Sequence, residues 1–180
     1  MNLISDNPRL QFMLRWLLAN VLGWALGLFL GGVALRVVGS ILGVLLGGAV
    51  TGVVVGVAQA FVLRADRRWW VVSAVGGGLA ALPAYVSGIT LIAGPVLGYF
   101  VIGAVYGAIF GAAQWVALRH ESGGWWVAVN GLAGGLCGCL TLGFNPLGLP
   151  LVCSLGPVVF GLLTGVVLLN LWETEEDDGG

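Results

Sequence analysis

The sequence predicts an all-α integral membrane protein with about six transmembrane helices, arranged as three tandem hairpins whose helices carry glycine zippers. Hydrophobic residues make up 59% of the 180-residue chain and charged residues only 8%, whereas a soluble domain carries about 25% charged residues. So few charges could not cover a soluble surface. Two further observations support the prediction: long uncharged segments divided by turn residues, and one 17-residue block that occurs twice.

Six apolar segments have the length that a helix needs to cross a bilayer core, roughly 17–25 residues. Arginines bound the first two, and turn residues such as Pro83, Gly94 and Pro150 divide the uncharged stretches that follow. The spans are expected at residues 10–34, 41–63, 69–85 (with an extension to 92), 95–118, 125–144 and 149–172. Pro157 is expected to kink the last span or to mark its start.

The repeated block defines the hairpins. Residues 48–64 read GAVTGVVVGVAQAFVLR and residues 103–119 read GAVYGAIFGAAQWVALR, with nine identical positions. Each hairpin holds two spans, so successive hairpins begin on the same side of the membrane and are related as parallel repeats. The chain is expected to form one membrane domain over 1–172, with hairpins over about 10–68, 69–124 and 125–172 and an acidic, disordered tail over 173–180.

The third copy of the block is the weakest, and the first helices of the hairpins are related more loosely. Gly156-Pro157 is matched with Gly94-Pro95, and no Gln or Arg follows it. Trp16-x3-Asn20 matches Trp126-x3-Asn130, and residues 70–74 give a poorer match in the middle hairpin. Terminal units of an array are often atypical because they have one neighbour fewer.

The arginines predict the orientation. With six spans, both termini and the loops after residues 63 and 118 lie on one side, which holds six arginines, while the other side holds only Arg36. Cytoplasmic loops carry such an excess of positive charge. Both termini are therefore expected in the cytoplasm, with the chain integral to the cell (inner) membrane.

The zipper glycines are expected to pack helices closely. They are spaced four residues apart, which places them in one groove along each helix. These residues are Gly48, Gly52, Gly56, Gly103, Gly107 and Gly111. Removing side chains lets backbones touch in lipid, so internal packing is the preferred interpretation; an oligomer interface and a glycine-lined pore stay open as alternatives.

Two glutamines share the glycine face. Gln59 and Gln114 each follow the last zipper glycine by three residues, so their amides point at a neighbouring helix. Asn20 and Asn130 hold equivalent positions in the first helices of their hairpins. We expect interhelical hydrogen bonds among these four residues, with a polar constriction on a substrate path as the alternative.

The residues after each block mark the cytoplasmic interface. Arg64 and Arg119 end the two copies, and Trp69, Trp70, Trp125 and Trp126 follow them. Arginines snorkel to the headgroups and tryptophans form a belt at the membrane surface. We therefore expect these six residues at the cytoplasmic edge of the bilayer.

The block G-x3-G-x3-G-x2-Q-W-x3-R, present here from Gly103 to Arg119, resembles a group of uncharacterised bacterial polytopic membrane proteins that repeat it in helical hairpins. The resemblance covers most of the chain. The first copy departs from it, with Ala60 in place of Trp. The resemblance implies a fold pattern and no activity.

Function is narrowed mainly by what the sequence omits. No span carries a carboxylate, the single His120 lies in a loop, and the arginines form no basic face. We therefore expect no enzyme activity, no cofactor or metal, and no nucleic acid partner; the bilayer is the expected partner, and a homo-oligomer or larger membrane complex stays open. The preferred hypothesis is a scaffold or accessory subunit, and the alternative is a small-solute transporter or channel with a Gln/Asn constriction.

Overall fold

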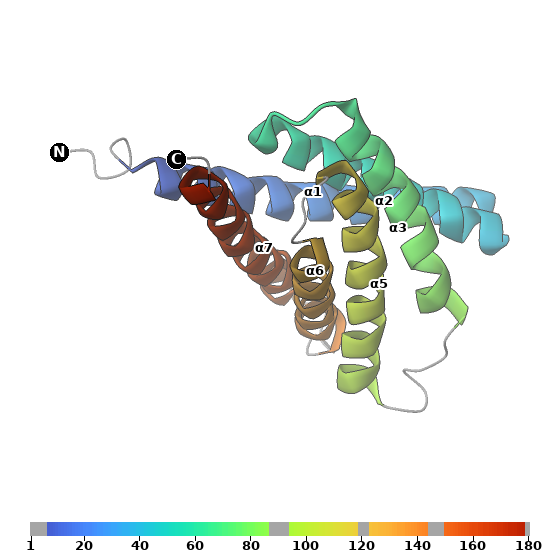
Figure 1. Cartoon of the computed structure of the whole chain (residues 1–180). Coiled ribbons are helices and arrows are strands. Elements are labelled where there is room, and N and C mark those ends of the chain that lie inside the picture. The colour runs from blue at the N-terminus through green and yellow to red at the C-terminus, as the bar shows by residue number, and fades with distance from the viewer. Residues whose placement is uncertain (1–6, 87–93, 119–122, 144–149, 179–180) are drawn as a thin grey trace.

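The computed structural model describes residues 7–86, 94–118, 123–143 and 150–178, which are helical almost throughout (Figure 1). The elements are α1 (Pro8–Val38), α2 (Ser40–Leu63), α3 (Arg67–Val86), α5 (Pro95–Leu118), α6 (Gly123–Gly138), the π-helical turn η1 (Cys139–Gly143) and α7 (Pro150–Asp178). The described part of the chain is therefore all-α, as the sequence predicts.

The helices form a closed ring. Each helix packs against the next one along the chain, and α7 also packs against α1. In Figure 1, α1 and α2 run across the view while α5 and α6 run down it, so the two pairs cross each other steeply. The first and last helices of the chain are thus neighbours, and the interior of the ring is lined by all six.

Local sequence explains where several helices begin and end. Asn7 caps α1, because its Oδ1 accepts a hydrogen bond from the Leu10 N–H at 3.1 Å. Gly39 separates α1 from α2 with a φ of 64°, a conformation that glycine adopts without strain. At the start of α3, Asp66 accepts a hydrogen bond from the Arg68 N–H at 2.8 Å.

Three helical segments of the described chain are long and apolar enough to cross a membrane: Pro8–Val38, Ser40–Leu63 and Val96–Leu118. A shorter apolar segment, Leu155–Leu171, lies within α7. Large apolar side chains cover the outside of the bundle, including Phe61 with 80% of its surface exposed. An apolar exterior of this extent indicates contact with lipid, and with the three candidate spans it indicates a location in the membrane.

The first glycine zipper joins α2 to α3. A Cβ added to Gly48 would overlap the backbone of α3, and one added to Gly52 would overlap the Ser73 carbonyl oxygen. A Cβ on Gly56 would lie 2.6 Å from the Ser73 Cβ. Only glycine permits so close an approach of two backbones.

The second zipper joins α5 to α6 in the same way. Cβ atoms on Gly103 and Gly107 would overlap the carbonyl oxygens of Gly134 and Asn130, and one on Gly111 would lie 2.6 Å from the Asn130 Cβ. The packing is internal, as expected. Both zippers, however, hold the second helix of one hairpin against the first helix of the next hairpin, rather than joining two helices of one hairpin.

The contact between α7 and α1 repeats this arrangement. A Cβ on Gly161 would lie 3.3 Å from the Asn20 Cβ, just as Gly56 faces Ser73 and Gly111 faces Asn130. The last helix therefore uses a glycine of its own to close the ring on the first helix.

Several expected boundaries shift. α1 continues past residue 34 to Val38, because residues 33–38 contain no glycine or proline and Gly39 is the next helix breaker. α6 gives way to the π-helical turn inside the span expected at 125–144. Pro157 lies within α7 and is not its start. The possible extension of the third span, residues 87–92, lies outside the described residues.

The prediction of a disordered acidic tail is wrong for residues 173–178, which are helical and continue α7. Glutamate favours helices, and no glycine or proline lies between Gly165 and Gly179. The helical period of the last span can therefore run on beyond its apolar part.

Candidate functional site

A buried layer of polar side chains crosses the interior of the ring, and Gln59 of α2 is its hub. The Gln59 Nε2 donates to Asn20 Oδ1 of α1 at 3.0 Å. Its Oε1 accepts from the Trp69 Nε1 of α3 at 3.3 Å and from the Gln114 Nε2 of α5 at 2.8 Å. One fully buried amide thus joins four helices.

Gln114 extends the layer toward α3. Its Nε2 also donates to the Ser73 Oγ at 3.0 Å, so both glutamines bond a polar residue on the first helix of their own hairpin. The expected approach of the glutamines to such helices is therefore present for Gln59–Asn20 and Gln114–Ser73. All four side chains are fully buried.

Thr164 takes the third position in the layer, and the sequence pattern missed it. The Trp16 Nε1 of α1 donates to the Thr164 Oγ1 of α7 at 3.0 Å, the counterpart of the Trp69–Gln59 bond. Thr164 follows Gly161 by three residues, as each glutamine follows its zipper glycine. The spacing Gly-x2-polar could have identified it, whereas the match between Gly156-Pro157 and Gly94-Pro95 placed α7 in the wrong register.

Asn20 and Asn130 are oriented by their own helices. The Asn20 Nδ2 donates to the Trp16 carbonyl at 2.9 Å, and the Asn130 Nδ2 donates to the Trp126 carbonyl at 2.9 Å. Each Oδ1 is thereby left for another partner, but only the Asn20 oxygen has one among the described residues. Thr164 carries no amide to reach Asn130, so the Gln–Asn ring expected from the sequence is incomplete here.

One more pair of groups in the layer lacks a hydrogen bond. The Trp126 Nε1 and the Gln114 Oε1 are both buried and have no partner among the described residues. Their counterparts in the preceding hairpin, Trp69 and Gln59, bond each other. A buried donor and acceptor are costly to leave unpaired, so a hydrogen bond between the Trp126 Nε1 and the Gln114 Oε1 would be favourable.

Apolar layers lie on both sides of the polar one. Four residues before each polar position in α2, α5 and α7 lie Val55, Phe110 and Phe160, which pack with Trp24. Four residues after them lie Leu63, Leu118 and Leu168, which pack with Trp16, Trp69 and Trp126. The four-residue step keeps these side chains on one face of each helix.

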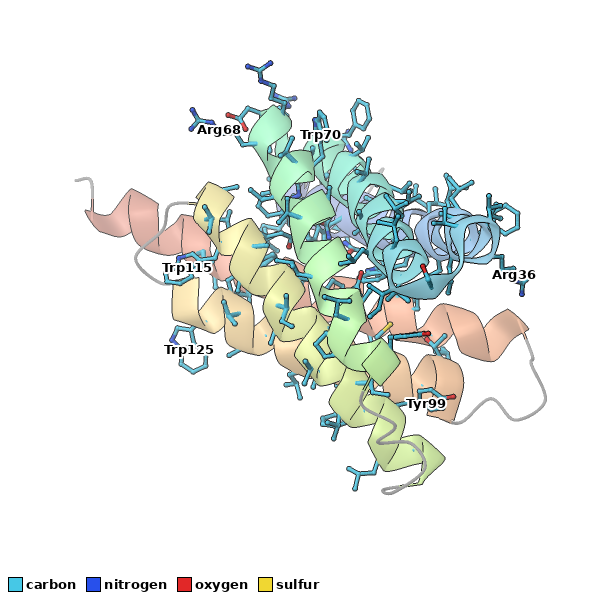
Figure 2. The ribbon with its side chains drawn as sticks, turned by 90° about the vertical axis from the view of Figure 1, so that its right-hand side faces the viewer. Arg36, Arg68, Trp70, Tyr99, Trp115 and Trp125 are labelled. Atoms are coloured by element: carbon cyan, nitrogen blue, oxygen red, sulfur yellow. The ribbon has the colours of Figure 1, made fainter. Side chains whose placement is uncertain are left out.

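The tryptophan prediction needs correction. Trp69 and Trp126 are 2% and 1% exposed and belong to the interior, as does Trp16. Trp70 and Trp125 are exposed and point outward, as an interfacial belt requires (Figure 2). Neighbouring residues on a helix are about 100° apart, so only one tryptophan of each pair can face inward.

The same geometry corrects the register of the middle hairpin. Trp69 and Ser73 are the counterparts of Trp16 and Asn20, and the segment 70–74 is not. A tryptophan four residues before a buried polar residue is the shared feature, and both face the interior.

The charged residues lie outside the layer. Arg64 is exposed and ends α2 in a left-handed conformation with a φ of 52°. Arg119 lies outside the described residues. Figure 2 shows Arg68 and Trp70 near one end of α3 and Arg36 away from them on α1. Within the described ranges, no three His, Cys, Asp or Glu side chains gather as a metal site would require.

Comparison with known proteins provides no relative for this chain: no family model, curated protein or solved structure matches it. The resemblance to repeat-containing bacterial membrane proteins therefore stays a prediction.

Proposed function

We propose that this chain is a non-enzymatic integral membrane protein of the scaffold or accessory class, crossing the bilayer six times as three hairpins with both termini in the cytoplasm. The observation that carries the proposal is the buried polar layer. Its amides and hydroxyls bond one another, the interior tryptophans and carbonyls of their own helices. Apolar layers cover it on both sides.

This layer weighs against the transporter hypothesis. A solute path needs polar groups that water can reach, whereas Gln59, Gln114 and Asn20 are fully buried. A molecule passing along the ring would have to separate Trp16, Trp69 and Trp126 on one side of the layer. The polar groups are therefore best explained as interhelical links, which are worth about 0.6–2 kcal/mol each in a bilayer.

The zipper glycines are occupied within the chain. Gly52 and Gly107 already touch the backbones of α3 and α6, so neither groove is free for a partner. Any partner would meet the outer surface of the ring, where the large apolar side chains lie.

Packing together with length supports six spans. α3 has 20 residues, and α6 with η1 has 16 and then five, each close to the length that crosses a hydrocarbon core. Each packs along a helix that meets the length and hydropathy requirements for a span. Arg67 and Arg68 lie at the turn between α2 and α3, and Arg36 lies at the opposite end of the hairpin, so the positive-inside rule favours a cytoplasmic location for that turn.

Cysteine labelling tests both parts of the proposal. In a chain with Cys137, Cys139 and Cys153 replaced by alanine, Ser73→Cys and Thr164→Cys probe the polar layer. Both residues are fully buried. With a membrane-impermeant maleimide, we expect neither to react from either side in sealed cells or inverted vesicles, and both to react after unfolding in SDS.

Ser40→Cys and Arg67→Cys are the matched exposed controls. Ser40→Cys should react only from outside the cell and Arg67→Cys only from the cytoplasm. Reaction of the folded Ser73→Cys or Thr164→Cys chain would reveal a water path and favour the transporter. Reaction of both controls from the same side would refute the topology.

A further inference from the structure

A cleft of about 430 Å³ lies at the turn between α2 and α3, on the outer surface of the bundle. Its volume falls within the roughly 300–1,000 Å³ of small-ligand sites. Phe61 and Arg64 line it from the end of α2, and Arg67 and Trp70 line it from the start of α3. All four side chains are exposed, so a ligand in the cleft can reach them directly.

The two arginines leave the cleft with a positive charge. Within the described ranges, neither Arg64 nor Arg67 forms an ion pair. Asp66 is the one acid of the lining, and Arg68 beside the cleft engages it. The Asp66 Oδ1 accepts from the Arg68 N–H at 2.8 Å, and the Asp66 Oδ2 lies 3.8 Å from the Arg68 Nε. Because Arg68 offsets the charge of Asp66, the charges of Arg64 and Arg67 are left for an anion.

The backbone at Arg64 supports a role for its side chain. Arg64 ends α2 with a φ of 52° and a ψ of 31°, in the left-handed region. Glycine adopts this conformation without strain and is the usual residue at this position of a helix end, whereas other residues are strained there. The turn itself therefore does not explain an arginine, and strained residues of this kind are concentrated at ligand-binding sites.

The remaining wall of the cleft is apolar and aromatic. Val57 and Phe61 line it four residues apart, so they share one face of α2 and lead from the arginines toward the middle of the helix. Trp70 lies at the same end of α3 as Arg68 (Figure 2), and tryptophan is enriched at the level of lipid headgroups. A small anion dissolved in water would gain nothing from such a wall. A lipid can place its phosphate at the arginines and an acyl chain along Val57 and Phe61.

We propose that this cleft binds an anionic glycerophospholipid, with its phosphodiester between Arg64 and Arg67. Arginine recognises phosphate oxygens through paired N–H···O hydrogen bonds, and basic pockets between membrane helices bind anionic headgroups. A phosphatidylcholine headgroup carries its own cation and brings no net charge, so the cleft should prefer an anionic lipid. The proposal goes beyond the scaffold role and needs only that this turn lies at a membrane surface, on either side of the bilayer.

Native mass spectrometry of the purified full-length chain, released from micelles with added lipid, tests the proposal. The probes are phosphatidylglycerol and phosphatidylcholine with the same acyl chains, which differ in the net charge of the headgroup. We expect the wild-type chain to bind phosphatidylglycerol more tightly. Arg64→Gln and Arg67→Gln should each weaken that binding about fivefold, as one arginine near an anionic lipid surface contributes, and leave phosphatidylcholine binding unchanged.

Arg15→Gln is the matched control. Arg15 is exposed on α1 and does not line the cleft, and the sequence predicts it on the same side of the membrane as Arg64. Its replacement should change neither affinity. Equal losses from the control and from the two cleft variants would overturn the proposal, because they would indicate a general attraction of the basic surface. Equal binding of the two lipids by the wild type would overturn it as well.

A second substitution keeps the test valid if Arg64→Gln disturbs the turn. Arg64→Gly removes the same charge and relieves the left-handed strain, so it should fold and should also weaken phosphatidylglycerol binding about fivefold. Unchanged binding by this variant would contradict the assignment of Arg64 to the site.

A competition arm separates a lipid from a soluble phosphate. Glycerophosphoglycerol has the same headgroup as phosphatidylglycerol but no acyl chains. We expect it to leave the bound lipid in place even in large excess. Displacement at a concentration similar to that of the lipid would overturn the proposal, because the apolar wall would then contribute nothing to binding.

Discussion

The contact between α5 and α6 at Gly107 gives the sharpest test of the packing. A Cβ at this position would overlap the carbonyl oxygen of Asn130, and it would lie 2.8 Å from the carbonyl carbon and 3.1 Å from the Gly134 Cα. These are backbone atoms, so they cannot rotate away. Carbon atoms in contact sit about 3.5–4.0 Å apart, so Gly107→Ala must separate the two helices by roughly 1 Å.

Gly32→Ala is the matched control. Gly32 lies within α1, and a Cβ there would meet nothing within 4 Å. Both substitutions gain the same helix propensity, about 1 kcal/mol in favour of alanine. The difference between the two variants therefore isolates the packing cost, for which overpacked sites give about 1–3 kcal/mol.

The assay is unfolding by SDS titration in mixed micelles, followed by tryptophan fluorescence. Buried Trp16, Trp69 and Trp126 should change emission as the interior opens. We expect Gly107→Ala to be less stable than Gly32→Ala by the amount stated above. Equal stability of the two variants would mean that α5 and α6 are not in backbone contact at Gly107.

Three further tests concern the polar layer and its tryptophans. Gln59→Leu should destabilise the fold by about 1 kcal/mol more than Gln114→Leu in the same titration. The reason is that Gln59 makes three hydrogen bonds and Gln114 two. A larger loss for Gln114→Leu would contradict the role of Gln59 as the hub of the layer. Thr164→Val keeps the shape but removes the acceptor of the Trp16 Nε1, and should cost about 1 kcal/mol and shift the tryptophan emission; an unchanged spectrum would argue against that bond. Trp69→Phe should lower the stability by about 1–3 kcal/mol, whereas Trp70→Phe, at the exposed neighbouring position, should change it by less than about 0.5 kcal/mol. Comparable losses would contradict the interior position of Trp69.

Helical periodicity explains why the glutamine prediction was useful. Gln59 and Gln114 share a face with their zipper glycines, and a four-residue step drifts little around a helix. The sequence could therefore predict that they point at another helix. It could not predict which helix, because Gln59 also meets Gln114, 55 residues away in the chain.

The third copy was harder to read because its side chains changed. Threonine replaces glutamine at position 164, and the shorter side chain keeps the bond to a tryptophan while losing the bond to an asparagine. A pattern that demands identical residues therefore passes over it. The Gly-Pro pair, which looked like the better match, marks a position within α7 and not a repeat boundary.

The tryptophan pairs were ambiguous for a different reason. Tryptophan is common both at membrane surfaces and in packed interiors, so residue type alone does not separate the two. The position of a tryptophan around its helix decides whether its side chain faces the interior. In each pair, the tryptophan that faces inward is the one followed four residues later by a buried polar residue. Trp69 with Ser73, and Trp126 with Asn130, give that register.

Closure of the ring by α7 on α1 is the central structural claim, and it is tested most directly by a disulfide between Asn20→Cys and Gly161→Cys in a chain without the native cysteines. A Cβ on Gly161 lies 3.3 Å from the Asn20 Cβ, close to the roughly 3.5–4.5 Å of a disulfide. We predict that mild oxidation forms a disulfide between these two cysteines within one chain. Mass spectrometry of the proteolytically cleaved chain detects it. The control pair, Gly32→Cys with Gly161→Cys, should form none. Failure of the first pair to bond, or bonding only between two chains, would contradict a ring closed within the monomer.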